Sequence, residues 1–165
     1  KVLIDVRTAG VNPVDTYIRA GTFPLLPPLP YTPGIDGAGV VGAAVSHLRV
    51  GDRVWFYTYA GSTAEVAVAT YAFKLPKTLS FSEGAYLGIP YTTAYRAMFT
   101  KGHIKDRVLI HGASGGVGLA ACQLASFAGA SLIVGTAGTQ QGLEAVLRYY
   151  TTECFLSDVC HSTET

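Results

Sequence analysis

The fold is decided by the stretch Arg107-Val108-Leu109-Ile110-His111-Gly112-Ala113-Ser114-Gly115-Gly116-Val117-Gly118-Leu119-Ala120-Ala121. A short run of β-branched residues and leucine stops at glycines, and an alanine-rich helical pattern begins directly after them. This order predicts a strand, a tight turn and a helix. Backbone N–H groups and the positive end of the helix dipole face outward together at such a turn, which suits a pyrophosphate.

The residues from Ala113 to Gly118 match the dinucleotide-binding pattern G/A-x-G-x-x-G. The small first residue permits the turn, Gly115 lets a phosphate approach the backbone, and Gly118 lets the helix pack close to the strand. Two other interpretations stay open at this point. The turn could bind nothing, or it could be a hydrolase nucleophile elbow, because residues 112–116 also read G-x-S-x-G around Ser114.

Two further enzyme classes are excluded by their own motifs. A phosphate-binding P-loop needs Gly-Lys followed by Ser or Thr, and no such triplet follows the turn. A short-chain dehydrogenase needs a tyrosine four residues before a lysine. No tyrosine stands at that spacing before Lys74, Lys77, Lys101 or Lys105.

Composition gives no sign of a charged partner or a metal. The 165 residues carry a formal net charge of +1, which offers no electrostatic reason to expect nucleic acid, a membrane surface or a polyanion. The most apolar stretch, residues 119–134, is interrupted by polar residues and glycine, so no membrane span is expected. The four histidines lie far apart, so no metal site is expected. The three cysteines show no paired spacing, which favours a cytoplasmic setting.

The first half of the chain predicts short strands separated by turns. Residues 2–6 alternate as a half-buried strand does, and residues 12–19 predict a short helix capped by Asn12 with Pro13 at its first position. Five prolines in residues 23–33 exclude regular structure there. Further strands are predicted at residues 37–45, 54–57 and 64–69, which together indicate a small β-barrel or sandwich.

The pattern changes near Ser80, where strands give way to alternating helices and strands. Residues 90–98 predict a helix, and residues 131–136 predict a second buried strand after the glycine turn and its helix. A second helix is predicted over residues 139–147. Strand and helix in alternation indicate an α/β fold with a parallel sheet and right-handed crossovers.

The end of the second strand favours NADP(H) over NAD. A dinucleotide fold that selects NAD usually carries an acid there, to hold the ribose 2′-hydroxyl. Here residues 135–141 contain no carboxylate, and the first one along the chain is Glu144. An acid would repel a 2′-phosphate, whereas small residues with N–H groups accept one. We therefore expect NADPH as the cofactor.

Several segments together resemble the zinc-free quinone oxidoreductases, the zeta-crystallin family of the medium-chain dehydrogenase/reductase superfamily. The matching segments are residues 9–19, 31–36, 51–54, 88–95, 111–123 and 135–139. Zinc-dependent members carry Gly-His-Glu after the proline of the second segment, where this chain has Pro33-Gly34-Ile35-Asp36. The resemblance is therefore to the metal-free branch.

The resemblance implies a partial GroES-like β-barrel domain over residues 1–85 and the N-terminal half of a Rossmann nucleotide-binding domain over residues 86–147. Residues 148–165 resemble the family no longer and are expected to form a divergent tail. The family's active site lies in the cleft between its two domains. The family passes reducing equivalents from NADPH to a small-molecule quinone, and its full-length members are expected to form homo-oligomers.

The resemblance also implies roles for particular residues. Catalytic roles fall to Tyr17, Asn12 and Asp15. Tyr17 would stack on the quinone and hydrogen-bond to it, and Asp15 would orient the polar groups around it. The implied cofactor-binding residues are Tyr17, Thr93, Ser114, Gly115, Gly116, Val117, Gly118 and Gly138. Without the resemblance, Tyr17 is better explained as a half-buried helix tyrosine whose hydroxyl caps a neighbour.

Compared with the family pattern, this sequence does not include the first barrel strands, which would precede Lys1, or the later Rossmann strands. We therefore expect a form truncated at both ends, and two hypotheses follow. In the first, the chain is an NADPH-dependent, zinc-independent quinone reductase. In the second, the truncated product is a non-catalytic binding protein or a structural, crystallin-like protein.

Overall fold

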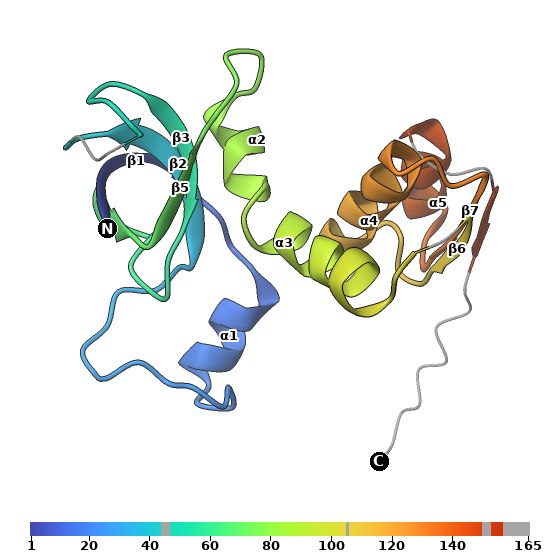
Figure 1. The fold of residues 1–165 in the computed structure, drawn as a ribbon. Helices are drawn as coiled ribbons and strands as arrows, with labels where there is room; N and C mark the ends of the chain where they lie inside the picture. The colour runs from blue at the N-terminus through green and yellow to red at the C-terminus, as the bar shows by residue number, and fades with distance from the viewer. Residues whose placement is uncertain (44–46, 105, 150–152, 157–165) are drawn as a thin grey trace. The chain divides into compact units, whose positions relative to one another are not determined.

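The computed structural model describes residues 1–43, 47–104, 106–149 and 153–156, and the chain divides into two compact units, Lys1–Ile89 and Pro90–Thr165 (Figure 1). The first unit is built on an antiparallel sheet and the second on a parallel one. The sequence pattern changes near Ser80, and the resemblance implies a domain boundary between residues 85 and 86, four residues before the division between the units.

The first unit holds one curled five-stranded sheet in the order β4-β1-β2-β3-β5 (Figure 1). All of its pairings are antiparallel, and β1 bulges between Val6 and Thr8. The strands are β1 Val2–Ala9, β2 Asp36–Val41, β3 Arg53–Tyr57, β4 Val66–Ala69 and β5 Tyr71–Lys74. The last of these was not predicted, because its alternation covers only four residues.

Alternation places one face of each strand inside the curled sheet. Val54 and Phe56 of β3 point into a core that also contains Ile4 and Val41. The neighbouring strand leaves no room for a side chain at Gly39 of β2, because a Cβ there would lie 2.2 Å from the backbone oxygen of Asp5 on β1. The glycines of this strand therefore permit close approach of two backbones, as the sequence predicts.

Two short helices accompany this sheet. The helix α2, Phe81–Tyr86, begins at Ser80, whose hydroxyl accepts from Glu83 N while the Glu83 carboxylate accepts from Ser80 N. Its Ala85 packs with Ala38 and Leu75 on the other face of the sheet from the barrel core. The helix α1, Pro13–Arg19, has Asn12 as its N-cap, as expected from the sequence.

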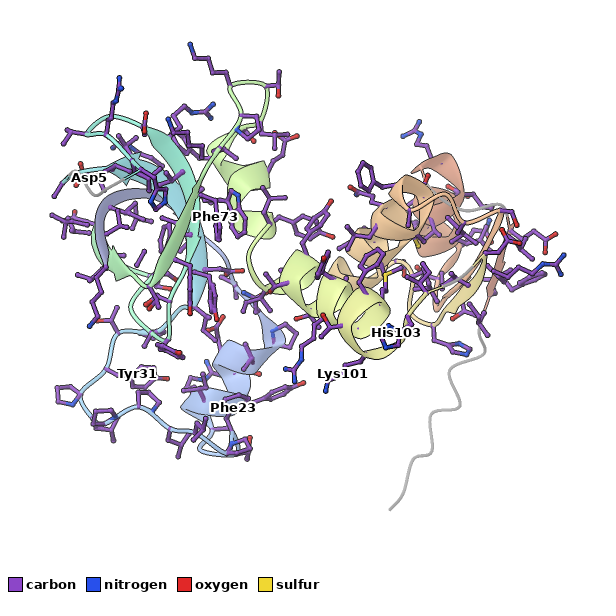
Figure 2. The ribbon with its side chains drawn as sticks, in the orientation of Figure 1. Asp5, Phe23, Tyr31, Phe73, Lys101 and His103 are labelled. Carbon is purple, nitrogen blue, oxygen red and sulfur yellow. The ribbon has the colours of Figure 1, made fainter. Side chains whose placement is uncertain are left out.

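The proline-rich segment forms no helix or strand. It runs beside α1, with Phe23 near its beginning and Tyr31 near its end (Figure 2). Its Leu25 and Leu29 are largely exposed. The prediction of an irregular segment that wraps over a surface agrees with this course.

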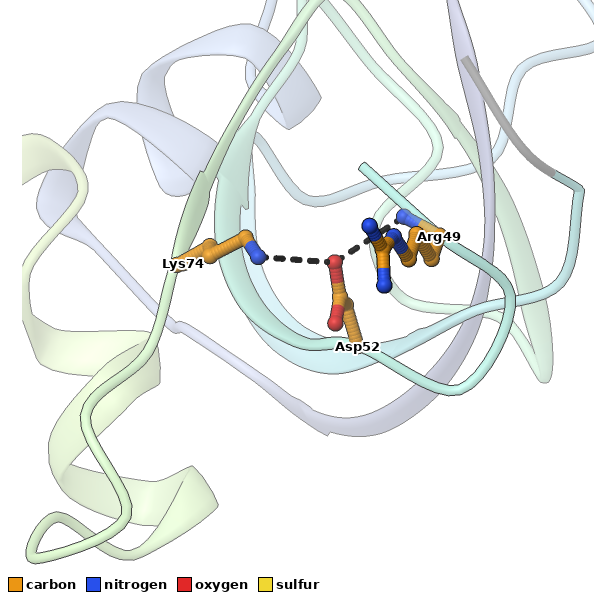
Figure 3. Close-up of polar contacts among 3 residues, drawn as sticks. All are labelled: Arg49, Asp52 and Lys74. Atoms are coloured by element: carbon orange, nitrogen blue, oxygen red, sulfur yellow. Dashed lines mark hydrogen bonds and ion pairs between the residues drawn. The ribbon is translucent and has the colours of Figure 1, made fainter. Parts of the chain in front are cut away.

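The carboxylate of Asp52 helps to hold residues 49–52, the part of the connection that leads into β3. Asp52 Oδ2 accepts from Arg49 N at 2.9 Å and pairs with Lys74 Nζ of β5 at 3.3 Å (Figure 3). Gly51 occupies the left-handed region at φ +89°, a conformation that glycine adopts without strain. One acid therefore joins the turn to the edge strand of the sheet.

The second unit begins with helices and continues as three parallel β-strands in the order β6-β7-β8. The helix α3, Ile89–Tyr95, starts on the last residue of the first unit and is followed by a π-helical segment, Arg96–Lys101. Lys101 and His103 mark the end of that segment in Figure 2. The remaining elements are β6 Arg107–Ile110, α4 Gly116–Phe127, β7 Leu132–Ala137, α5 Gln140–Tyr149 and β8 Glu153–Leu156.

The core of the second unit lies where α4 meets the sheet. Ala120, Cys122 and Ala125 of α4 are fully buried, and Ile133 of β7 and Val146 of α5 complete the same cluster. The small side chains of α4 allow the helix to lie close to the strands. This agrees with the predicted strand–turn–helix order.

The strand β8 was not predicted from the sequence, which placed its residues in a divergent tail. Its Phe155 pairs in parallel register with Thr136 of β7. Because β8 has only four residues and they do not alternate, their sequence gives little strand signal. The three strands have the order of the first half of a doubly wound sheet.

Candidate functional site: a dinucleotide turn and a buried carboxylate

The glycine turn lies between β6 and α4, as the sequence predicts. Gly112 adopts φ +64°, and Gly115 is the N-cap of α4 but offers no side-chain hydrogen bond to the helix. The first turn of any helix has N–H groups that no carbonyl of that helix can reach. An N-terminus without a side-chain cap, on a twelve-residue helix, therefore presents donors and a positive dipole end to an anion.

Gly118 is required by close packing. A Cβ at this position would lie 2.2 Å from Gly112 O and 2.6 Å from Ala113 Cα, so no side chain fits without a shift of the backbone. Gly115 is different, since its nearest contact would be Gly112 O at 3.4 Å. Gly118 therefore shapes the turn, and Gly115 leaves its outer surface bare.

Thr136 of β7 fixes the turn to the neighbouring strand. Its backbone oxygen accepts from Ala113 N at 2.8 Å, and its Oγ1 accepts from Gly112 N at 3.2 Å. His111 Nδ1 lies 3.3 Å from the same hydroxyl oxygen. His111 is exposed, directly after the end of β6, with Thr136 as a hydrogen-bonding neighbour.

The end of β7 brings a second group of hydroxyls to the turn. Thr139 Oγ1 accepts from Gly142 N at 3.0 Å and so caps α5. A Cβ at Gly142 would lie 2.9 Å from the Cβ and Oγ of Ser114, which places Ser114 against the start of this helix. Gly138 is exposed between them. The local surface is made of hydroxyls, glycine and a helix N-terminus, without a carboxylate before Glu144.

A second polar cluster lies in the first unit, around Asp36 at the start of β2. Asp36 is fully buried, and its Oδ1 accepts from Asn12 Nδ2 at 2.8 Å while its Oδ2 accepts from Ile89 N at 2.6 Å. Asp15 Oδ2 in turn accepts from Asn12 N at 2.8 Å. Burial raises the pKa of the Asp36 carboxyl above its ordinary value, and the hydrogen bonds from Ile89 and Asn12 offset part of that rise.

The structure brings Asn12 and Asp15 together and shows what their side chains contact. Both form the capping box at the start of α1, and Asn12 is buried. Tyr17, on the same helix, leaves 52% of its surface exposed. Thr93 is exposed on α3, where it lines an open groove with Arg96 and Lys101.

Sequence reasoning missed Asp36 as a functional candidate and quoted it only as part of the segment that carries no Gly-His-Glu. A signal was present, because Asp36 is an acid at the beginning of an otherwise apolar and glycine-rich strand. Its partners, however, are 24 and 53 residues away along the chain. No spacing rule joins residues at those separations.

The described residues contain no group of three or more His, Cys, Asp and Glu side chains placed to hold a metal ion. None of the helices in the described ranges has the length and apolar character that crossing a bilayer needs.

Comparisons with known proteins agree with this architecture. The family model described as "Alcohol dehydrogenase GroES-like domain" matches residues 1–100. A quinone oxidoreductase of Homo sapiens is 52% identical over 163 residues, which are 94% of this chain and 49% of that protein. The chain spans about half the length of the curated relatives it matches.

Solved structures show the same similarity. The Escherichia coli quinone oxidoreductase complexed with NADPH has a TM-score of 0.81 and 33% sequence identity, covering 93% of this chain and 49% of that chain. A probable oxidoreductase from Mycobacterium abscessus has a TM-score of 0.86 and 31% identity, covering 96% and 53%. The predicted fold class, a partial GroES-like barrel with half of a Rossmann domain, is confirmed.

Proposed function

We propose that this chain catalyses NADPH-dependent, zinc-independent reduction of quinones, because it belongs to the alcohol dehydrogenase GroES-like family in its quinone oxidoreductase branch. The similarity to an NADPH complex supports the choice of cofactor. The proposal covers the cofactor, the substrate class and the residues that contact them.

One observation carries the cofactor choice: the end of β7 offers hydroxyls and a helix N-terminus where an NAD-selective fold has an acid. Ser114 lies against Gly142, and Thr139 caps the helix that begins there. These groups can donate hydrogen bonds to a 2′-phosphate, and they do not repel it. Gly138, exposed at the same place, is proposed to lie beside that phosphate.

The pyrophosphate is proposed to bind at the turn itself, over residues 114–118. The N-terminus of α4 has no side-chain cap, so a phosphate can take the place of a capping oxygen. Gly115 allows the backbone to be reached, because its outer side is open. Val117 is partly exposed and can cover an apolar part of the cofactor.

The quinone is proposed to meet Tyr17. Reduction of a quinone to a hydroquinone takes a hydride and a proton, and NADPH supplies the hydride when bound. The exposed ring of Tyr17 can stack on a flat substrate, and its hydroxyl can donate a hydrogen bond to a quinone oxygen. Asn12 and Asp15 are proposed to hold the helix that carries Tyr17, and Thr93 to contact the nicotinamide end of the cofactor.

Titration with both cofactors tests the cofactor choice. Fluorescence titration of the chain is expected to give a lower Kd for NADPH than for NADH. Gly138→Asp should reduce the preference for NADPH by about tenfold or more, because its charge repels a 2′-phosphate, consistent with a Coulomb energy of about 1–4 kcal/mol at 4 Å. Gly138→Asn, of the same size without the charge, is the control and should keep the ratio. Equal binding of the two cofactors by the unmodified chain would contradict the proposal.

Turnover separates the enzyme from its non-catalytic alternative. The chain is expected to oxidise NADPH with a small soluble quinone, and Tyr17→Phe should raise KM for the quinone because the hydrogen bond is lost. Binding of NADPH without turnover would favour the alternative, a binding or crystallin-like protein. The proposal also includes a cytoplasmic location and a homo-oligomeric state. Analytical ultracentrifugation of the purified chain tests the oligomeric state.

A further inference from the structure

Segments far apart in the sequence converge on Asp36. Its Oδ1 accepts from the side chain of Asn12, at the start of α1, and its Oδ2 accepts from the backbone of Ile89, the first residue of α3. Gly10 N also donates to the backbone oxygen of Asp36 at 2.9 Å. One residue therefore joins the segments that follow β1 and α2 to the beginning of β2.

The surroundings of this carboxylate are shaped to fit it. A Cβ at Gly10 would lie 2.1 Å from Asp36 Oδ1, and a Cβ at Gly88 would lie 2.3 Å from Asp36 Cβ. Both glycines therefore provide the room that the acid occupies. A fully buried acid is costly unless its oxygens accept hydrogen bonds, and here both oxygens do.

The two donors require a side chain with two acceptors. Asn12 Nδ2 and Ile89 N can only donate at this place, and a carboxylate offers an acceptor oxygen to each. An amide at position 36 would turn its own N–H₂ toward one of them. An acid is therefore specified by the geometry and not merely tolerated.

We propose that Asp36 is a positioning residue for quinone reduction: by holding Asn12 and Ile89 together, it fixes the start of α1 and thereby the place of Tyr17. This inference rests on the proposed function for its catalytic consequence. Asn12 is the N-cap of α1, and Tyr17 lies in the last turn of the same short helix. A shift of the cap therefore moves the tyrosine.

A reciprocal exchange of the two side chains tests the proposal. Asp36→Asn places an N–H₂ against a donor, and Asn12→Asp places two carboxylates side by side. The double variant N12D/D36N restores one donor and one acceptor between positions 12 and 36, and it leaves the amide oxygen at position 36 to accept from Ile89. Aspartate is also a good N-cap, so α1 keeps its cap in the double variant.

The readouts are kcat/KM for a soluble quinone, the Kd for NADPH and the unfolding midpoint. Each single variant is expected to lose about tenfold or more in kcat/KM, as displaced reacting groups do, with little change in the Kd for NADPH. The double variant should recover most of that loss. A D36N chain that unfolds more easily but keeps kcat/KM would overturn the proposal, because Asp36 would then serve stability alone.

A second variant covers the case in which D36N does not fold. Asn12→Ser keeps a capping hydroxyl but is too short to reach Asp36, so the cap survives and the link to Asp36 is lost. It should lose kcat/KM as D36N does. Activity equal to that of the unmodified chain would overturn the proposal.

Hydrogen exchange separates failure of this inference from failure of the proposed function. If the unmodified chain reduces no quinone, the proposed function fails, and the amides of α1 still report on Asp36. Faster exchange across residues 13–19 in D36N, reversed in N12D/D36N, would support the positioning role. Unchanged exchange in D36N would overturn it.

Discussion

Each unit has one polar centre, the cluster around Asp36 in the first unit and the glycine turn before α4 in the second. Both depend on glycine, but for opposite reasons. In the first unit, Gly10 and Gly88 make room for a side chain, the carboxylate of Asp36, which accepts hydrogen bonds on both oxygens. In the second unit, Gly118 makes room for backbone, the carbonyl of Gly112. The Asp36 cluster, the closed centre, has its polar groups hydrogen-bonded within the fold. The glycine turn, the open centre, ends in a helix whose N-cap residue, Gly115, has no capping side chain.

The difference supports the proposal that the glycine turn, and not the Asp36 cluster, receives a ligand. Buried polar groups are stable only when they are hydrogen-bonded, and Asp36 meets that condition within its own unit. The N-cap of α4 is Gly115, which has no side-chain oxygen to offer to the first turn of the helix, so this end is the one proposed to receive an anion. The closed centre therefore positions residues, and the open one is suited to binding a phosphate.

The largest effect is expected at the open centre. Gly118→Ala places a methyl group 2.2 Å from a backbone oxygen that cannot turn away, so the free energy of unfolding should fall by about 3 kcal/mol or more, at the upper end of overpacking costs. Gly115→Ala is the matched control, because its methyl group meets nothing closer than 3.4 Å. Urea unfolding should separate the two variants.

The same pair of variants distinguishes folding from binding. Gly115→Ala should cost no more than about 1 kcal/mol, because alanine is a poorer N-cap than glycine, and it should bind NADPH more weakly because the methyl group covers the outer side of the turn. Equal stability of the two variants would show that Gly118 is not required for packing, and the contrast between the two centres would be lost.

At the closed centre, Gly88→Ala is expected to cost about 2 kcal/mol, since the added methyl group meets a side chain instead of backbone. Asp36 can shift slightly, but its two hydrogen bonds then lengthen. Thermal unfolding followed by circular dichroism measures the loss. The control is Ala20→Gly, which changes an exposed position in the same unit. Gly21→Ala is not used, because Gly21 has a positive φ. A G88A chain as stable as the control would contradict a tightly filled site.

A smaller effect is expected at the cap of α2. Ser80→Ala removes the hydroxyl that accepts from Glu83 N and should cost about 1 kcal/mol, the usual effect of losing an N-cap. Ser80→Asp keeps an acceptor and should preserve stability. A loss in both variants would show that something other than the cap holds this helix.

The smallest effect concerns pH, and its sign differs between two acids of the first unit. Burial raises the pKa of Asp36 above its ordinary value of 3.8. The stability that this shift adds to the free energy of unfolding is therefore fully present below pH 3.8 and is lost as the pH rises through the raised pKa. The hydrogen bond from Arg49, followed by Lys74, lowers the pKa of Asp52, so its contribution is lost as pH falls through the lowered value.

Unfolding midpoints measured from pH 3 to pH 7 test these signs. Relative to the unmodified chain, Asp52→Asn should lose most stability near neutral pH and little at the acid end. The difference for Asp36→Asn should shrink as pH rises, because the unmodified chain then carries the cost of a buried charge. The same slope for both variants would contradict the assignment of one closed and one solvent-exposed acid.

Local signals made much of the fold predictable. The helix at Asn12, the cap at Ser80 and the strand–turn–helix around Gly115 each depend on neighbours within a few residues, and the structure contains all three. The strands β5 and β8 were missed because each has only four residues. Such short runs become strands through the partners they meet, which no local pattern records.

The two polar clusters, one in each unit, also differed in how far the sequence predicted them. The turn was found because a phosphate cradle made of backbone needs a fixed spacing of glycines within one segment. The cluster at Asp36 was not found, since its donors come from Asn12 and Ile89, and only the folded chain brings them together. Side-chain clusters of this kind need tertiary structure to be seen.

The full burial of Cys122 in the core of the second unit gives that unit a built-in reporter. A thiol reagent reacts with a thiolate that it can reach, so this cysteine is protected until α4 leaves the sheet. In a chain with Cys154 and Cys160 replaced by serine, the rate of labelling at Cys122 would therefore measure how often the unit opens. Slower labelling on addition of a nucleotide would show binding without any turnover.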